Sequence, residues 1–83
     1  MKIDARVEFD EVTAAELFND YVRVPVDMDY VEADYESVHD YVANELETMF
    51  GRSFTREQFS IVNVDEIIEA INFDEFEGKT SEF

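Results

Sequence analysis

DMDYVEADYESVHDYVANELETMF, the segment from Asp27 to Phe50, contains eight carboxylates and no lysine or arginine. Apolar residues recur through it at the three- and four-residue spacings of one helix face. This stripe consists of Tyr35, Val38, Tyr41, Val42, Leu46, Met49 and Phe50. It predicts a helix near 35–50, about 24 Å long, that ends at Gly51 because glycine is favoured just past a helix end. The segment is therefore expected to be folded, with its charge on the outer side.

The acids of this segment are the candidate functional residues. On the outer face of a helix, carboxylates four residues apart lie about 6 Å from each other. Together with the acids of the preceding loop they form the partner-binding face that we predict, which comprises Asp27, Asp29, Tyr30, Glu32, Asp34, Glu36, Asp40 and Glu47. Tyr30 is included as an exposed aromatic, because tyrosine is enriched at interfaces. Tyr35 and Tyr41 are expected in the core.

Two strands are predicted before this segment, because apolar and polar residues alternate there. Residues Lys2 to Phe9 alternate without a break, and residues near 22–28 alternate around Pro25. Since proline has no N–H to give to a neighbouring strand, the second strand is expected at the edge of a sheet.

A short helix is predicted between these strands. Thr13 and Glu16 have the spacing of a capping box, in which each side chain accepts a hydrogen bond from the other residue's backbone N–H. The helix is expected to run from Ala14 to about Tyr21 and to bury Leu17, Phe18 and Tyr21.

The part of the chain after Gly51 predicts a turn, a short strand near 59–62 and a last helix near 64–72. Thr55 and Gln58 repeat the capping-box spacing at the turn. Asn63 is placed to cap the last helix, whose apolar residues face inward.

The expected fold is α+β. With 83 residues the chain is one domain, and we place it at residues 1–77, with a frayed tail at 78–83. A short antiparallel or mixed sheet is expected to be packed by the main helix near 35–50 and the C-terminal helix near 64–72.

The charge balance restricts the partners. The chain has 22 acidic and 6 basic residues, a formal net charge of −16. Such a charge repels nucleic acid and anionic membranes, so the expected partner is a basic protein surface, above all that of a nucleic-acid-binding protein. There is no cysteine, the N-terminus does not resemble a signal peptide, and no apolar run approaches the roughly 18 residues of a membrane span. We expect a cytoplasmic protein, in the host cytoplasm if it is phage-encoded.

The sequence contains no convincing catalytic or cofactor motif. Asp27 and Asp29 resemble the start of a calcium loop, but Glu32 stands where glycine is needed and Val38 where the bidentate glutamate belongs. Loose cation binding there is left open. The single histidine, His39, is expected at the surface or its boundary. We therefore expect no enzyme, no cofactor and no metal centre.

Three interpretations of the acidity remain. The first is a DNA mimic, whose ordered carboxylates occupy and block a nucleic-acid-binding surface. In size and composition the chain is similar to small acidic phage proteins that inhibit restriction, CRISPR or nucleoid proteins, although it carries no family motif. The second is another protein-interaction module, such as an antitoxin, adaptor or assembly subunit. The third is adaptation to high salt, in which the acids serve solubility only. A homodimer is left open.

Overall fold

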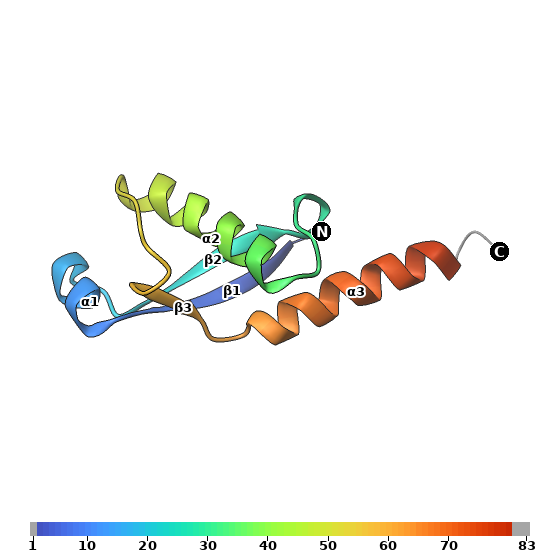
Figure 1. The fold of residues 1–83 in the computed structure, drawn as a ribbon, viewed down its shortest axis with the longest axis horizontal. Coiled ribbons are helices and arrows are strands. Elements are labelled where there is room, and N and C mark those ends of the chain that lie inside the picture. The colour runs from blue at the N-terminus through green and yellow to red at the C-terminus, as the bar shows by residue number, and fades with distance from the viewer. Residues whose placement is uncertain (1, 81–83) are drawn as a thin grey trace.

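The protein is a three-stranded antiparallel sheet with three α-helices (Figure 1). The structure, a computed structural model, describes the backbone of residues 2–80 and the side chains of residues 2–73. Its elements follow in the order β1 (Lys2–Phe9), α1 (Glu11–Leu17), β2 (Tyr21–Asp27), the 3₁₀ turn η1 (Met28–Tyr30), α2 (Tyr35–Phe50), β3 (Phe59–Ile61) and α3 (Val64–Thr80). The α+β class is confirmed.

Strand β1 lies in the centre of the sheet, in the order β2-β1-β3. It pairs along its length with β2, so that Ala5 faces Val24, and its last three residues pair with β3. The prediction from Pro25 is confirmed, because β2 is an edge strand. The sheet is antiparallel throughout, which settles the choice left open by the sequence.

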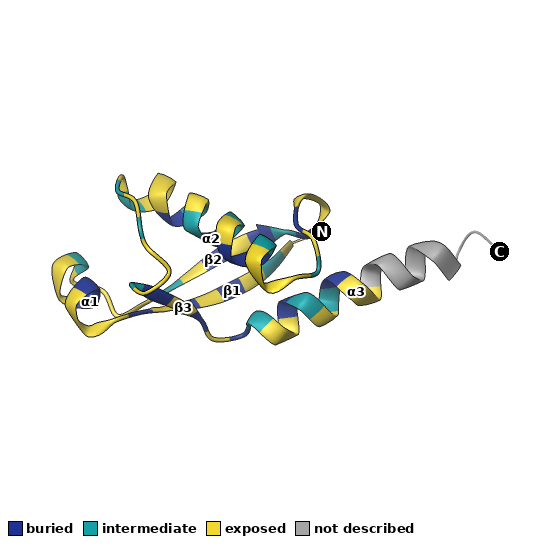
Figure 2. Cartoon of the chain, in the orientation of Figure 1, coloured by how far each residue is buried: buried dark blue, intermediate teal, exposed yellow. Residues whose placement is uncertain are grey.

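Helix α2 covers one face of the sheet and has the bounds that its apolar stripe predicts. Its buried apolar side chains, Val38, Val42 and Leu46, pack with the inward residues of β1 and β2 in one core (Figure 2). The helix begins where the Asp34 carboxylate accepts the Ser37 N–H at 2.7 Å. It ends at Gly51, whose φ of 70° places it in the left-handed region that glycine adopts without strain.

The apolar stripe of α2 is rotated from the one that we predicted. Tyr35 is 54% exposed and Met49 is exposed as well, whereas His39 is buried, with 3% of its surface accessible. The prediction of a core Tyr35 and a surface His39 was therefore wrong. The reason is that β3 lies beside the start of α2, where the imidazole stacks on Phe59 with ring centroids 5.3 Å apart. Strand pairing decides this contact, and the helical period cannot show it.

Asn63 joins β3 to α3 and completes the edge of β1. Its side-chain oxygen accepts the Arg6 N–H at 2.8 Å, and its amide donates to the Asp4 carbonyl at 2.9 Å. Asn63 stands before the first residue of α3, as predicted, but its side chain bonds the strand rather than the helix end. Helix α3 therefore starts beside β1, and it buries Ile67 and Ile71 in the core.

Helix α1 differs most from its prediction. It starts at Glu11, because Asp10 rather than Thr13 is its cap, and the Asp10 carboxylate accepts the Thr13 N–H at 2.9 Å. The hydrogen bonds from Thr13 lower the pKa of Asp10 below its usual value. The helix ends at Leu17, before the left-handed Phe18, and Tyr21 belongs to β2 instead. Phe18 and Tyr21, both predicted to be buried, are 96% and 39% exposed, and Leu17 is half-buried.

The C-terminal helix is longer than predicted. It runs to Thr80 instead of ending near residue 72, and its second half extends beyond the sheet, giving the molecule a long axis of 52 Å (Figure 1). The frayed tail predicted at 78–83 stays a prediction, because its last three residues lie outside the described part of the chain.

Candidate partner-binding surface

Three of the predicted site residues form a row on α2, opposite its buried side. Glu36, Asp40 and Glu47 are all exposed, as expected from their spacing. The row is not free of positive charge, because the Arg56 guanidinium lies 3.0 Å from a Glu36 oxygen and 3.5 Å from an Asp40 oxygen. We call Glu36, Asp40 and Glu47 the α2 row. Its carboxylates are held at fixed spacing, since the opposite side of the helix is packed in the core.

Arg56 was missed by the sequence analysis, although it is the cation that faces the α2 row. Its position depends on the loop 51–58, which an aromatic cluster holds against the end of α2. In this cluster Phe54 lies with ring centroids 5.8 Å from Phe50 and 5.7 Å from Phe9. The distance in sequence between Arg56 and the acidic segment does not indicate that the loop brings Arg56 back to α2. The Thr55–Gln58 capping box is half formed, because the Gln58 side chain accepts the Thr55 N–H at 2.8 Å.

The remaining site residues form a second group, around η1 and the start of α2. Their acids shape the local backbone: the Asp27 carboxylate accepts the Asp29 N–H at 3.1 Å, and Asp34 caps α2. The Glu32 N–H donates to Ser37 Oγ at 3.0 Å. Tyr30 is 79% exposed, which agrees with its prediction. We call Asp27, Asp29, Tyr30, Glu32 and Asp34 the η1 group.

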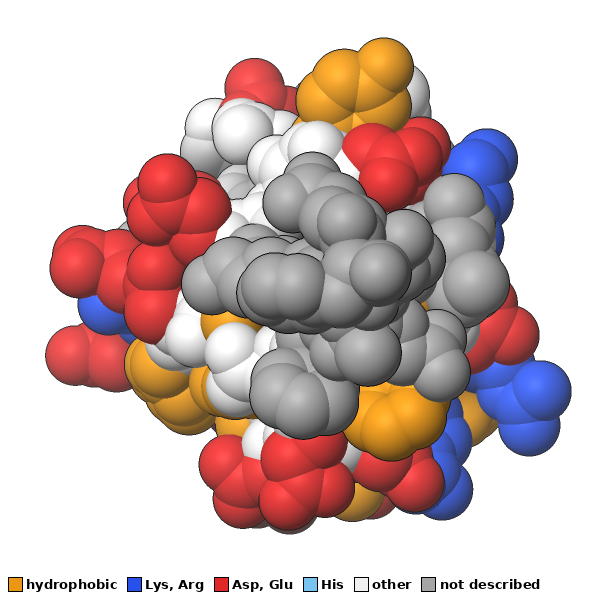
Figure 3. Space-filling view, turned by 90° about the vertical axis from the view of Figure 1, so that its right-hand side faces the viewer, with side chains coloured by type: hydrophobic (Ala, Val, Ile, Leu, Met, Phe, Trp, Pro, Cys, Tyr) orange, Lys and Arg blue, Asp and Glu red, His pale blue; other side chains and the backbone are white. Residues whose placement is uncertain are grey.

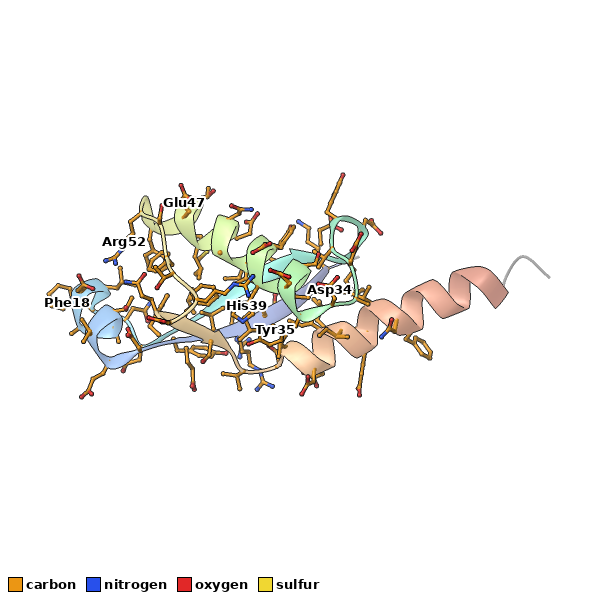
Figure 4. The ribbon with its side chains drawn as sticks, in the orientation of Figure 1. Phe18, Asp34, Tyr35, His39, Glu47 and Arg52 are labelled. Carbon is orange, nitrogen blue, oxygen red and sulfur yellow. The ribbon has the colours of Figure 1, made fainter. Side chains whose placement is uncertain are left out.

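The η1 group precedes α2 and the α2 row runs along it, so the two groups follow one another and do not converge on a point. Asp34 and Glu47 lie at opposite ends of α2 (Figure 4), thirteen residues and about 20 Å apart. Tyr41 joins the η1 group to the helix, because its half-buried side chain accepts the Asp27 N–H at 3.3 Å. The arrangement is an extended charged surface, suited to contact with a macromolecule rather than enclosure of a small substrate.

Acidic side chains also occur on the rest of the molecule. None of the acidic residues whose side chains are described is buried, and in the end view of Figure 3 they stand on several sides. The face of the sheet away from α2 is mixed instead. Arg6 and Arg23 are paired across β1 and β2 there, with Arg6 3.8 Å from Glu66. Arg23 donates to the Tyr21 hydroxyl, which raises the pKa of Arg23.

His39 is the one buried ionisable side chain among residues 2–73. Its ring lies between Tyr35 and Phe59, with centroids 4.6 Å and 5.3 Å away, and neither nitrogen has a hydrogen-bond partner. Burial lowers the pKa of His39, and the charge of Arg56 lowers it further, against a smaller opposite effect of Asp40. The imidazole is therefore neutral at pH 7 and belongs to the core rather than to a site.

The described residues give no sign of a metal centre or a membrane span. The segment tested as a calcium loop is occupied by η1 and the first turn of α2. Within residues 2–73 no three His, Asp or Glu side chains are grouped as a metal site requires. No helix in the described part of the chain has the length and apolar character needed to cross a bilayer.

Comparisons with known proteins identify no relative. The chain matches no protein-family model, no curated protein and no solved structure.

Proposed function

We propose that this chain is a non-enzymatic acidic binding protein, which uses the α2 row and the η1 group to occupy a basic nucleic-acid-binding surface of another protein. The observation that carries the proposal is the row of exposed carboxylates on a helix whose opposite side is packed in the core. Because the backbone that carries these carboxylates is already ordered, only their side chains have to be fixed when a partner binds, so less conformational entropy is lost. Blocking that surface would make the protein an inhibitor, as a DNA mimic is.

The α2 row alone carries fewer charges than a DNA strand of the same length. From Glu36 to Glu47 the helix rises about 16 Å, a length over which one DNA strand carries about five charges. The α2 row holds three carboxylates, and two of them pair with Arg56. The η1 group supplies the further charges that a phosphate-like surface requires, and Tyr30 adds a contact with a flat apolar surface.

The experiment compares two triple variants with the same net charge. The first neutralises the α2 row by Glu36→Gln, Asp40→Asn and Glu47→Gln. The matched control neutralises three exposed acids of α3 by Asp65→Asn, Glu66→Gln and Glu69→Gln. Proteins captured from a host lysate at low salt are identified, and each is tested for release of labelled duplex DNA on addition of the chain.

We expect the α2 variant to displace DNA at least tenfold less effectively, whereas the α3 control keeps its effect. The affinity of the chain for the captured protein should fall steeply with added salt, because the contact is between opposite charges. Equal loss in the two variants would show that only total charge matters, and no displacement by the natural chain would reject the mimic.

Salt adaptation is the competing explanation that the structure favours most, because acids lie on several sides of the fold (Figure 3). It predicts that the protein unfolds when molar salt is diluted to ordinary buffer. Circular dichroism across that dilution separates the two, since a mimic must be folded at low salt to compete with DNA.

A further inference from the structure

An apolar surface at the opposite end of the molecule from the tip of α3 is not explained by the acidic face. Phe18 follows the last residue of α1 and points away from the fold (Figure 4), with 96% of its surface exposed. Its backbone is left-handed, with φ 54° and ψ 37°, a conformation that glycine or asparagine normally adopts at a helix end. The Phe18 ring is therefore exposed to solvent and contributes nothing to the core.

Phe18 borders an open hollow between α1 and the start of β2, with a volume of about 580 Å³. Its lining combines the apolar side chains of Ala14, Ala15, Phe18 and Tyr21 with Asn19 and the acids Glu11 and Asp20. Among the described residues, no lysine or arginine belongs to this lining. We call this hollow the α1 notch. Its apolar lining suits an aliphatic side chain, and its two acids suit a neighbouring positive charge.

The charge of the edge decides what can fill the notch. A second copy of this chain would bring Glu11 and Asp20 against surfaces of the same sign, at a net charge of −16 for each copy. Helix α3 ends the described part of the chain at the far end of the long axis (Figure 1), away from the notch.

We propose that the α1 notch binds a segment of a protein partner that carries an aliphatic side chain next to lysine or arginine. The aliphatic group lies on Ala15 against the rings of Phe18 and Tyr21, and the basic group faces Glu11 or Asp20. This interaction does not depend on the DNA-mimic proposal, because it combines an apolar contact with two charges that lie outside the α2 row and the η1 group.

The test uses three capped synthetic peptides as probes: Lys-Leu-Lys-Leu-Lys, Lys-Ser-Lys-Ser-Lys and Glu-Leu-Glu-Leu-Glu. Each is titrated into the ¹⁵N-labelled full chain while amide chemical shifts are followed. The Lys/Leu peptide should produce saturable shifts at the amides of Ala15, Asn19 and Tyr21. The Lys/Ser peptide should bind these amides at least fivefold more weakly, and the Glu/Leu peptide should leave them unchanged.

The deciding variant is Phe18→Asn, which removes the ring and retains a residue suited to the left-handed backbone. The matched control is Phe73→Asn, because Phe73 is an exposed phenylalanine on α3 with 64% of its surface accessible. We expect a fivefold or greater loss of Lys/Leu affinity in the first variant and no change in the second.

Several results would overturn the proposal. Equal affinity of both variants, or equal binding of the Lys/Leu and Lys/Ser peptides at the notch, would show that the apolar wall takes no part. A dimer of the natural chain in sedimentation that Phe18→Asn dissociates would assign the notch to a second copy. Loss of notch binding in the α2 row variant would show that net charge alone attracts the peptide.

Discussion

Helices α1 and α2 differ in how much apolar side chain they bury. Helix α2 buries Val38, Val42 and Leu46 and exposes carboxylates, whereas α1 buries Thr13 and Ala14. The large ring that follows α1 lies outside the fold. The difference shows what each helix contributes: α2 holds the domain together and can carry charge at fixed positions, whereas α1 contributes little to the core and leaves apolar surface available for a partner.

The largest expected effect compares the same substitution in the two helices. Leu46→Ala removes a fully buried side chain from α2 and should lower the free energy of unfolding by about 3 kcal/mol. Leu17→Ala in α1 should cost about 1 kcal/mol, because Leu17 is only half-buried. Urea denaturation measures both. Equal losses would mean that α1 supports the core as strongly as α2 does.

The second prediction concerns the buried histidine of α2. His39→Phe retains a ring between Tyr35 and Phe59 and removes two buried nitrogens without partners, so it should raise the free energy of unfolding by about 1 kcal/mol or more at pH 7. Thermal unfolding measures the gain. A loss of stability would indicate that the imidazole makes hydrogen bonds in solution.

The same residue gives a pH dependence of known sign. Because burial lowers the pKa of His39, the unfolded chain takes up a proton below pH ~6.5 that the folded chain does not. Stability should therefore fall as the pH drops from about 7 to 5. His39→Phe should abolish this slope, and an unchanged slope in the variant would assign it to other groups.

The third prediction tests the strained end of α1. Phe18→Gly relieves the left-handed backbone and should raise the free energy of unfolding by about 1 kcal/mol. Phe18→Ala retains a Cβ in the same conformation and serves as the control, with a change near zero. A loss of stability in the glycine variant would show that the ring packs against the fold in solution.

The smallest effect is expected at the cation that faces the α2 row. Arg56→Gln removes the exposed ion pairs with Glu36 and Asp40 and should lower stability by at most about 1 kcal/mol. If the α2 row binds a basic partner, the variant should bind it more tightly, because no internal cation competes. Arg52→Gln is the control, since Arg52 pairs with Glu16 on α1. Equal gains in binding would reflect net charge alone.

The sequence predicts those elements that a local period or a local rule determines. The bounds of α2 follow from its apolar stripe and from Gly51, and the edge position of β2 follows from Pro25. The exposure of the α2 row and of Tyr30 follows from helical spacing and loop placement. These features depend on residues within a few positions of each other.

The features that the sequence missed depend on contacts between distant segments. His39 is buried because β3 lies beside it, and Arg56 reaches the α2 row because three aromatic rings hold its loop. At α1 the error was local, because the prediction took Thr13 as the cap and overlooked Asp10, which directly follows β1. Moving the cap by three residues shifted the whole helix and placed Phe18 outside it.

The side chain of Asn63 has a consequence for how this sheet meets other chains. By accepting the Arg6 N–H and donating to the Asp4 carbonyl, it occupies the edge of β1 beyond β3, where the third strand would otherwise continue. Pro25 interrupts the other margin, on β2, and β3 has only three residues. An exposed edge strand can pair with a strand of another chain and so start amyloid-like stacking. In this protein one outer strand contains a proline and the other has only three residues, so neither edge is a good template for a further strand.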